Sequence, residues 1–505
     1  MRVLYRRSSL AAAVYTSVAI TGSVVSVACS PDTRATPLAP PSASLTEAEA
    51  SYRYSYLLVG KTADALPTTL EAEVAAAGAV LTGTIPQIGL AMVESARSDF
   101  ADGARFTGIS DVLPDVPIGV SASGREVGTS LGSAAALAAD APPIPPGGDP
   151  LSGLQWALRA IKAPEAWALG YSGKGVRVAV LDGGIQATHV DLAPNLNTAL
   201  STSFVPGQTF STPPGAHGTQ VSGVIAAARN GIGTVGVAPD VDLVAIKILP
   251  ASGTGPLSRI AQGLVYAADI GANVANISAG TNLPRGSEIV TDDRGTPDPT
   301  DDVRLRVTNT AVLGLMHALT RATRYAHAKG VLIVTAAGNI AKDFDHSKSD
   351  IGLPQEVPHV MTVGPTGPVG WVFDYDTDLD VHPSYGNFGQ SYLTLSAPGG
   401  NFDVVNRPDL PSSCTLLGFT WPCQVFDIVI TTGLGSSVAW NVGGSLAAPH
   451  VAGVAALVFE KLGPSATPDE VEAILRQSAD DLGKPGNDDF YGHGRVNALR
   501  AVTWK

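Results

Sequence analysis

The sequence predicts an α/β protein in which a central, mostly parallel sheet is covered by helices on both faces, with a small α+β unit ahead of it. The main observation is a series of apolar runs without the alternation of half-exposed strands, as is typical of strands buried on both faces. These runs lie at 176–184, 241–249, 272–278, 330–339, 359–365 and 392–399. Helical stretches separate several of them, and strand–helix–strand alternation favours a parallel sheet. The helical stretches lie at 217–228, 258–270, 307–329 and 445–462.

The composition is that of a loop-rich globular protein. Of the 505 residues, 45% are hydrophobic and 15% are charged, so a large buried core is available. Glycine and proline, at 55 and 37 residues, exceed their usual share. The formal net charge of −13 argues against a nucleic-acid partner, because binding to phosphates requires a basic face.

Residues 1–29 have the pattern of an export signal peptide. Three arginines among the first seven residues precede an apolar stretch of small residues at 10–28. The triplet VAC that ends at Cys29 resembles a bacterial lipoprotein cleavage site, although Ser26 departs from the usual Leu, Val or Ile. We therefore expect an extracellular or cell-surface protein, with lipidation of Cys29 and plain secretion as alternatives. No later stretch is long and apolar enough to span a bilayer, so only a lipid anchor would contact a membrane.

Composition divides the rest of the chain into four regions. Residues 30–51 form a low-complexity tether rich in Pro, Ser, Thr and Ala. Residues 52–120 contain three strand-like runs, with a helical stretch between the first two, and predict a small α+β domain. Residues 121–149 contain an Ala-rich and then a Pro-rich run, typical of a flexible and then a stiff linker. The region 150–505 carries the predicted parallel sheet.

Four polar residues lie where predicted strands end or predicted helices begin. Asp182 and Asn339 end strands, whereas His217 and Ser445 begin helices. Taken singly, each has an ordinary structural reading as a turn former or a helix cap. Ligands of parallel sheets, however, collect at the carboxyl ends of the strands. The chain order Asp, His, Ser is also one of the orders known for serine-hydrolase triads.

These residue types together supply the chemistry of acyl transfer. The hydroxyl of Ser445 needs a base that removes its proton during attack, and the imidazole of His217 can act as that base at neutral pH. The carboxylate of Asp182 would hold one tautomer of the imidazole and stabilise its charged form. The side-chain amide of Asn339 and the backbone N–H of Ser445 can donate to the oxyanion. The pattern therefore predicts nucleophilic catalysis by Ser445.

The same segments resemble the sequence blocks of the subtilisin-like serine proteases (subtilases). VAVLDGGI is similar to the aspartate block of that family, HGTQVSGVIAA to its histidine block, VLIVTAAGN to its asparagine segment and GGSLAAPHVAGVAAL to its serine block. The resemblance covers nearly all of 150–505 in the family's order. It implies a subtilisin-like catalytic domain that hydrolyses peptide bonds through an acyl-enzyme intermediate, requires no cofactor and acts on polypeptides as a monomer.

The resemblance also has departures. Gly183 follows the aspartate where the family usually has Ser or Thr, and Gly444 and Leu446 flank the serine where the family usually has Thr and Met. Gly183 removes a hydroxyl near the carboxylate, and Gly444 gives the backbone ahead of Ser445 more freedom to lose. None of the four chemical groups is missing. We therefore expect a working enzyme that is slower than is usual for the family.

More loosely, residues 52–120 resemble the ferredoxin-like propeptide of the family, which assists folding and blocks the site until it is cut. The resemblance implies that the chain is a self-processed zymogen inhibited by its own propeptide. Activation cleavage is then expected in the linker 121–149, within the window 136–150.

Substrate binding is a further implication of the resemblance. In the family, a short segment after the third strand and a Gly-rich segment after the second pair with an extended peptide, which is β-augmentation. The corresponding residues are Ser278, Ala279 and Gly280 in the first segment and Ser252 and Gly253 in the second. Because Ala279 is small and apolar, the neighbouring pocket is expected to accept a medium or large apolar side chain.

Cys414 and Cys423 lie nine positions apart in SCTLLGFTWPC, a segment predicted to be a loop. In an exported chain this spacing favours a disulfide, with two free thiols as the alternative.

His189 and His450 lie near Asp182 and Ser445 in sequence, and both are predicted to be structural. The acidic run 374–380 lacks the Gly and Glu of a calcium-binding EF-hand loop. Structural calcium is common in the resembled family, but no metal ligand can be assigned.

Two other functions fit parts of the sequence. GGSLA at 443–447 faintly resembles the elbow of an α/β-hydrolase lipase or esterase, but that fold requires Asp or Glu and then His after the serine. An inactive, surface-displayed binding module that kept the fold is the other alternative. The joint presence of Asp182, His217, Asn339 and Ser445 argues against it, since a binding module has no need of all four. Hydrolysis of p-nitrophenyl esters without peptide cleavage would favour the lipase or esterase. Loss of linker cleavage in Ser445→Ala would favour the enzyme over the binding module.

Overall fold

The computed structural model describes most of the chain after the predicted tether. The described residues are 54–120, 127–130, 143–293, 300, 302–347, 349–403 and 410–505. All of them belong to the unit Ala48–Lys505. The predicted signal peptide, the tether, the lipidation candidate Cys29 and most of the linker lie outside the described residues.

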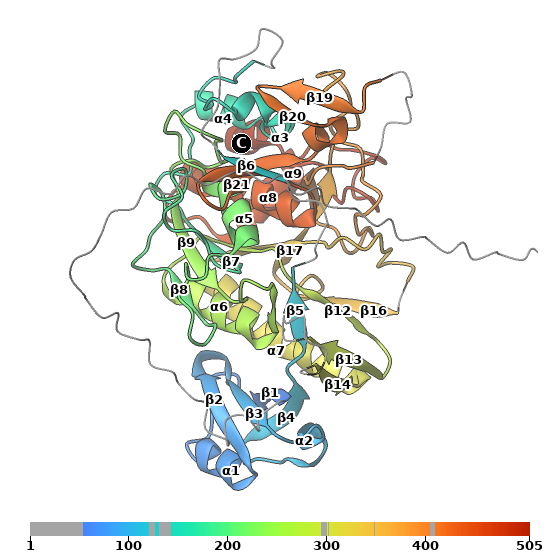
Figure 1. Ribbon diagram of the computed structural model, residues 1–505. Coiled ribbons are helices and arrows are strands. Elements are labelled where there is room, and N and C mark those ends of the chain that lie inside the picture. The colour runs from blue at the N-terminus through green and yellow to red at the C-terminus, as the bar shows by residue number, and fades with distance from the viewer. Residues whose placement is uncertain are drawn as a thin grey trace, which may run out of the picture. The chain divides into compact units, whose positions relative to one another are not determined.

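A seven-stranded parallel sheet forms the centre of the region 150–505 (Figure 1). Its strand order is β18-β17-β15-β11-β7-β9-β8. The strands are β7 (Arg177–Asp182), β8 (Thr202–Ser203), β9 (Asp242–Lys247), β11 (Val274–Ile277), β15 (Leu332–Ala336), β17 (Val360–Thr366) and β18 (Leu395–Pro398). The six predicted strands all belong to this sheet, so the predicted fold class is confirmed.

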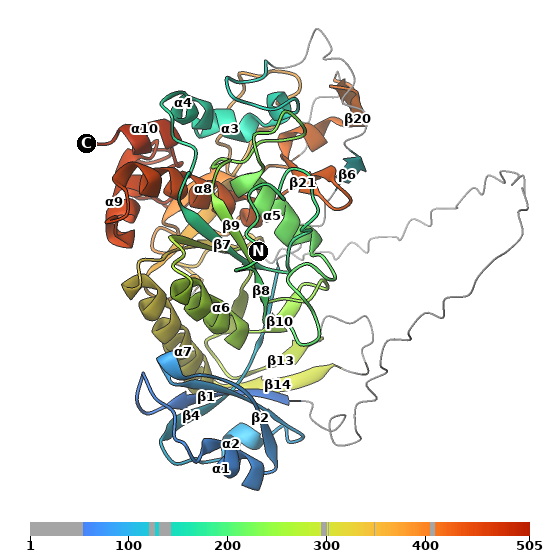
Figure 2. The ribbon, with the colours of Figure 1, turned by 90° about the vertical axis from the view of Figure 1, so that its left-hand side faces the viewer.

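Helices cover both faces of the sheet (Figures 1 and 2). Side chains of β7 alternate between two cores, so that Val178 and Val180 pack with α5 and α8 whereas Ala179 and Leu181 pack with α6 and α7. The four helices are α5 (Ala216–Ala226), α6 (Ser258–Asp269), α7 (Asn309–Ala328) and α8 (Gly444–Leu462). Smaller helices complete the core beside α8, namely α3 (Trp156–Ala160), α4 (Ala163–Ala168), α9 (Pro468–Ser478) and α10 (Ala498–Thr503).

Helix α8 is long and apolar because it is the central core helix. The prediction that no later stretch is long and apolar enough to span a bilayer is wrong for α8, which among the described helices has that length and composition. However, 83% of the stretch is buried inside the protein. Its residues pack against β11, β15, β17 and β18. Burial on all sides explains the nearly continuous apolar composition.

Residues 54–120 form a four-stranded antiparallel sheet with the strand order β2-β3-β1-β4. The chain order β-α-β-β-α-β is that of a ferredoxin-like unit. Along β1, Tyr56 and Leu58 pack against α1, whereas Leu57 and Val59 join the core formed with α6 and α7. The elements are β1 (Tyr54–Gly60), α1 (Leu70–Ala76), β2 (Ala79–Ile85), β3 (Leu90–Ser95), α2 (Phe100–Gly103) and β4 (Ile109–Pro114).

Antiparallel strands that were not predicted extend the region 150–505. The short strand β5 (Pro117–Gly119) pairs with β10 (Thr254–Pro256). Within the predicted linker, β6 (Val127–Ser130) adds a third strand to the hairpin of β21 (Val429–Gly433) and β22 (Ser437–Asn441). Other added pairs are β12 (Thr281–Pro284) with β16 (Asp350–Leu353) and β13 (Glu288–Asp292) with β14 (Val303–Val307).

The prediction of a loop around the two cysteines is wrong. Residues Ser413–Leu416 and Phe419–Pro422 form a hairpin, β19–β20, which a disulfide between Cys414 and Cys423 closes. Leu417 and Gly418 both have positive φ, of 48° and 81°, as the tight turns of two-residue hairpins require. The turn geometry therefore decides for paired strands over a loop.

Candidate active site

The first strand and the helix that follows it bring Asp182 and His217 together. Asp182 ends β7 with its side chain 1% exposed, and His217 is the second residue of α5. The Nδ1 atom of His217 lies 2.9 Å from Oδ2 and 3.1 Å from Oδ1 of Asp182. The backbone N–H of Gly183 donates to Oδ1 at 2.6 Å. These hydrogen bonds fix the carboxylate and direct one edge of the imidazole toward it.

The close approach of α5 to the end of β7 depends on Gly218. A Cβ atom at this position would lie 2.3 Å from the carbonyl oxygen of Gly184 and 3.1 Å from Oδ1 of Asp182. Contacts near 2.3 Å do not occur between such atoms, so a larger residue would push the helix away. The glycine after the histidine is therefore a requirement of the Asp182–His217 geometry.

Ser445 and Asn339 meet at the start of α8. Ser445 is the second residue of this helix and is 3% exposed, and Asn339 follows β15. The backbone N–H of Gly444 donates to Oδ1 of Asn339 at 2.8 Å, so the Nδ2 end of the amide is its donor end. Gly443 has a φ of 145°, and a side chain there would approach Nδ2 to 2.9 Å. Glycine at 443 thus avoids a close contact with the donor end of the amide.

Ser278 contacts Ser445 from the end of β11. Its hydroxyl donates to the carbonyl oxygen of Ser445 at 3.0 Å, and the hydroxyl of Ser445 donates to the carbonyl oxygen of Ser278 at 3.4 Å. A small pocket opens beside these two residues. Its lining residues are Gly119, Ser278, Ala279, Gly280, Thr281, Asn282, Ala336, Ala337, Gly338, Gln355 and Ser445. The segment predicted to bind substrate therefore lies against the predicted nucleophile.

A set of buried hydrogen bonds ties the helix of His217 to the hairpin that leads to Ser445. Asn441 donates from Nδ2 to Oε1 of Gln220 at 2.7 Å. The hydroxyls of Thr431 and Thr432 donate to the backbone carbonyls of Gln220 and Thr219 at 2.8 and 2.7 Å. The sequence pattern did not single out these residues, although Gln220 lies within the histidine block. They hold the two halves of the site in register.

The segment that ends the 54–120 unit lies along the predicted substrate-binding edges. Gly119 and Gly280 exchange backbone hydrogen bonds of 3.0 Å each way, and the N–H of Val120 donates to the carbonyl of Gly253 at 3.2 Å. Thr254 opposes Gly119 in the β5–β10 pair. Of the residues predicted to bind substrate, Gly253 and Gly280 thus pair with this segment, and Ser252 lies just ahead of it. The strand β5 therefore lies along these edges, and its Gly119 lines the same small pocket as Ser445.

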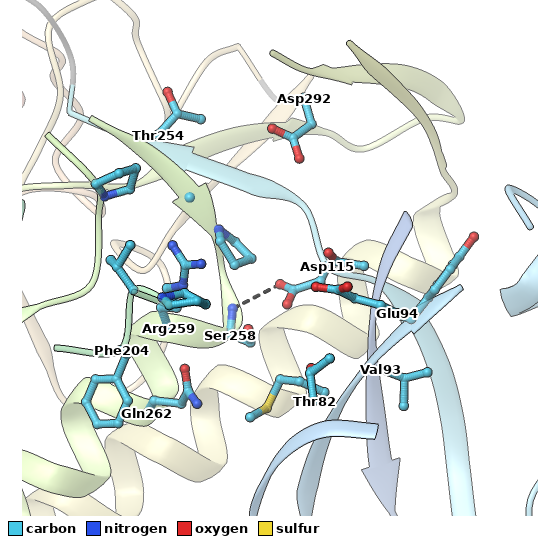
Figure 3. Close-up of a pocket in the computed structure, with 18 residues that line it drawn as sticks. Thr82, Val93, Glu94, Asp115, Phe204, Thr254, Ser258, Arg259, Gln262 and Asp292 are labelled. Carbon is cyan, nitrogen blue, oxygen red and sulfur yellow. Dashed lines mark hydrogen bonds between the residues drawn. The ribbon is translucent and has the colours of Figure 1, made fainter. Parts of the chain in front are cut away.

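Residues just before β5 cap helix α6, as Figure 3 shows. Oδ1 of Asp115 accepts from the N–H of Ser258 at 3.0 Å, and the carbonyl of Val116 accepts from the N–H of Leu257 at 2.9 Å. Burial raises the pKa of Asp115 to about 6. Arg259 faces the same pocket, and burial lowers its pKa. The first turn of α6, which has no side-chain cap of its own, is thus satisfied by the 54–120 unit.

The two other histidines near the site in sequence have structural contacts. His189 is buried, its Nδ1 accepts from the N–H of Asp191 at 3.1 Å, and its Nε2 donates to the carbonyl of Ser437 at 3.0 Å. His450 contacts the carbonyl of Leu446 through Nδ1 at 2.7 Å, and burial lowers its pKa to about 4. Within the described ranges, no group of three or more His, Cys, Asp or Glu side chains is placed to hold a metal ion.

An aspartate–histidine pair and a serine beside an amide donor, at the carboxyl edge of a parallel sheet, are the groups that a serine hydrolase requires. The chain belongs to the subtilase family, whose sequence model matches residues 173–494. It is 34% identical over 347 residues to M-protease of Shouchella clausii, covering 69% of each chain. It is also 34% identical over 347 residues to Subtilisin Savinase of Lederbergia lenta, covering 69% of this chain and 98% of the relative.

Solved structures agree on the fold. The epidermin leader peptide processing serine protease of Staphylococcus aureus superposes with a TM-score of 0.66 at 22% identity, covering 89% of this chain and 98% of that one. A lanthipeptide protease superposes with a TM-score of 0.54 at 28% identity, covering 70% of this chain and 96% of that one. The protein is therefore a serine endopeptidase with the subtilisin-like fold, and peptides are its substrates.

Proposed function

We propose that this endopeptidase is an exported zymogen that uses Asp182, His217 and Ser445 as its catalytic triad and Asn339 in its oxyanion hole. The observation that carries the proposal is the hydrogen-bonded Asp182–His217 pair at the same sheet edge as Ser445 and Asn339. Hydrolysis needs no cofactor in this scheme, because the four groups supply base, orientation, nucleophile and donor. We assign no ligands to structural calcium, and we expect a monomer.

The proposed reaction follows from these positions. Nε2 of His217 takes the proton of Ser445 as Oγ attacks the peptide carbonyl, and Asp182 stabilises the imidazolium through Nδ1. The amide of Asn339 and the N–H of Ser445 donate to the oxyanion. His217 then gives the proton to the leaving amine as the C–N bond breaks, which leaves an ester on Ser445. Water activated by His217 hydrolyses that ester and regenerates the hydroxyl.

The zymogen part of the proposal rests on β5. The β5 segment pairs with Gly280 and Gly253 as an extended peptide would, and its Gly119 lines the pocket beside Ser445. An inhibitor that occupies the substrate edges excludes other peptides until the connection downstream is cut. We propose that residues 52–120 are this propeptide, that the cut lies in 121–149 and that 150–505 is the catalytic domain. Export would follow from residues 1–29, with Cys29 as the candidate lipid anchor.

Mutation of Ser445 tests the proposal. The full chain should mature to a shorter species that hydrolyses peptides, whereas Ser445→Ala should stay uncut and inactive. Ser465→Ala alters an exposed serine and is the matched control. Intact mass and the N-terminal sequence report maturation, and a fluorogenic peptide reports turnover. Maturation and turnover of Ser445→Ala at the rate of the control would contradict the proposal.

A further inference from the structure

Strand β22 pairs with β21 on one side, and a third strand covers its other side. The partner is β6, which pairs with it antiparallel, Val127 opposite Trp440 and Ser130 opposite Ser437. In this three-stranded sheet β22 lies between β21 and β6, although β6 is far from both in sequence. Without β6, β22 would present a row of backbone donors and acceptors, which is a template for another chain. The hairpin therefore has the form of a strand-binding site.

This edge begins next to the nucleophile. Only Val442, Gly443 and Gly444 separate the last residue of β22, Asn441, from Ser445. The register places the first residue of β6 near that end of β22 and its last residue at the far end. A chain that pairs with β22 in this direction therefore runs away from the active site.

The other side of the site binds the same chain. Strand β5 pairs with β10 and Gly280, and Gly119 lines the pocket that contains Ser445. Six residues, 121–126, separate Val120 from Val127 in sequence. A connection of this length reaches at most about 25 Å. The two binding edges are therefore close enough for one polypeptide to use both, with Ser445 between them.

The β22 edge is also rigid. Val438 and Trp440 are buried, and the Trp440 ring contacts the rings of Phe419, Trp421 and Phe426. His189 holds the start of the strand through the carbonyl of Ser437. A preformed edge of this kind loses little entropy when a strand binds.

We propose that, in the matured enzyme, β22 binds an extended segment of the protein substrate on the leaving-group side of the cut bond. The segment takes the place that β6 holds in the uncut chain. This inference rests on the proposed function and adds a second peptide-binding edge to it. Because the contact is made by backbone groups, the enzyme would favour substrates that can form a strand downstream of the cut, with little demand on side-chain identity.

Peptides of two lengths test the site on the self-processed enzyme. The proposal places a cut between β5 and β6, upstream of the window 136–150 that is expected from the sequence. The short peptide therefore has the sequence of residues 115–126, and the long one has that of 115–131. We expect kcat/KM to be about tenfold higher for the long peptide, the gain that one or two strand hydrogen bonds provide. Equal kcat/KM values for the two peptides would overturn the proposal. If both peptides are cleaved equally and Ser445→Ala cleaves neither, the proposed function still stands.

N-methylation provides the matched control. In a strand, alternate N–H groups point toward and away from the neighbouring strand. We compare two versions of the long peptide, one methylated at the nitrogens of residues 127 and 129 and the other at those of residues 128 and 130. One version should lose the tenfold gain in kcat/KM, and the other should keep it. Equal behaviour of the two methylated peptides would contradict pairing. Retention of residues 127–130 in the mature enzyme by intact mass, with no gain for the long peptide, would also overturn the proposal.

Discussion

Helices α6 and α8 begin in the same way, but different parts of the chain supply the acceptors for their first N–H groups. Neither has a side-chain cap of its own, so the first N–H groups of each need acceptors from elsewhere. At α8 the acceptor is Asn339, from the same domain. At α6 the acceptors are Asp115 and the carbonyl of Val116, from the 54–120 unit. In the proposed zymogen, the partner at α8 is permanent, whereas the partner at α6 leaves with the 54–120 unit.

The largest expected effect is that of removing the acceptor at the start of α8. Asn339→Ala should lower kcat by about a hundredfold to a thousandfold with little change in KM, the loss known for removing one such donor from subtilisin. The physical reason is that the amide donates only to the charge that develops in the transition state. Steady-state kinetics on a fluorogenic peptide measure this effect. An unchanged kcat would remove Asn339 from the oxyanion hole.

A change at α6 should affect docking and leave kcat alone. Burial raises the pKa of Asp115 from its ordinary 3.8 to about 6, so the docked unit binds a proton that the separated unit releases. Docking should therefore weaken as the pH rises from about 4 to about 6 and level off above that. The change should be about a hundredfold for a shift of about two units. Sedimentation of the self-cut protein across this range measures it.

Two variants separate charge from hydrogen bonding at this position. Asp115→Asn keeps an acceptor for Ser258 without the buried charge, so its docking should be independent of pH and tighter than that of the parent above pH 6. Asp115→Ala loses the acceptor, so docking should weaken at every pH. A parent protein whose docking does not change with pH would show that Asp115 is not the titrating group.

A smaller effect is expected where the two halves of the catalytic site are joined. Gln220→Ala removes the 2.7 Å hydrogen bond from Asn441 and leaves the backbone acceptors of Thr431 and Thr432 in place. We expect kcat to fall about tenfold, because one buried hydrogen bond among three is lost. Gln220→Glu, which keeps an acceptor for Asn441, should recover part of the rate. Equal loss in both variants would argue against a positioning role.

The smallest effects concern the two glycines that depart from the family pattern. A Cβ atom at Gly183 would meet nothing closer than 3.5 Å, and one at Gly444 nothing closer than 3.4 Å. Both sites therefore accept a Cβ atom at ordinary contact distances. Gly183→Ser and Gly444→Thr should raise kcat by no more than a few-fold, mainly through reduced backbone freedom at 444. No change in either variant would mean that the departures do not slow the enzyme.

The sequence was informative where strands and helices are long and buried. The six strands and four helices of the sheet layers were predicted close to their observed bounds, because continuous apolar runs and helical spacing mark them directly. The capping box of α9, formed by Thr467 and Glu470, is a local signal that also marks the start of this helix in the sequence. All four proposed site residues follow from their places at element edges.

Pairing between distant segments was not predictable. Strand β6 has four residues in a region whose composition suggests a linker, and its pairing with β22 links positions about 300 apart in sequence. The same holds for Asp115, whose neighbour Ser258 is 143 positions away. Short strands with little periodicity gain their stability from partners that the local sequence does not name.

The most direct test of the central claim is where a serine-directed phosphonate binds. The account predicts a single adduct on the peptide that contains Ser445, loss of all turnover with it, and no adduct in His217→Ala, because the hydroxyl then lacks its base. Mass spectrometry of the labelled, digested enzyme reports the position. An adduct on another serine, or labelling of Ser445 that is as fast without His217 as with it, would contradict the account.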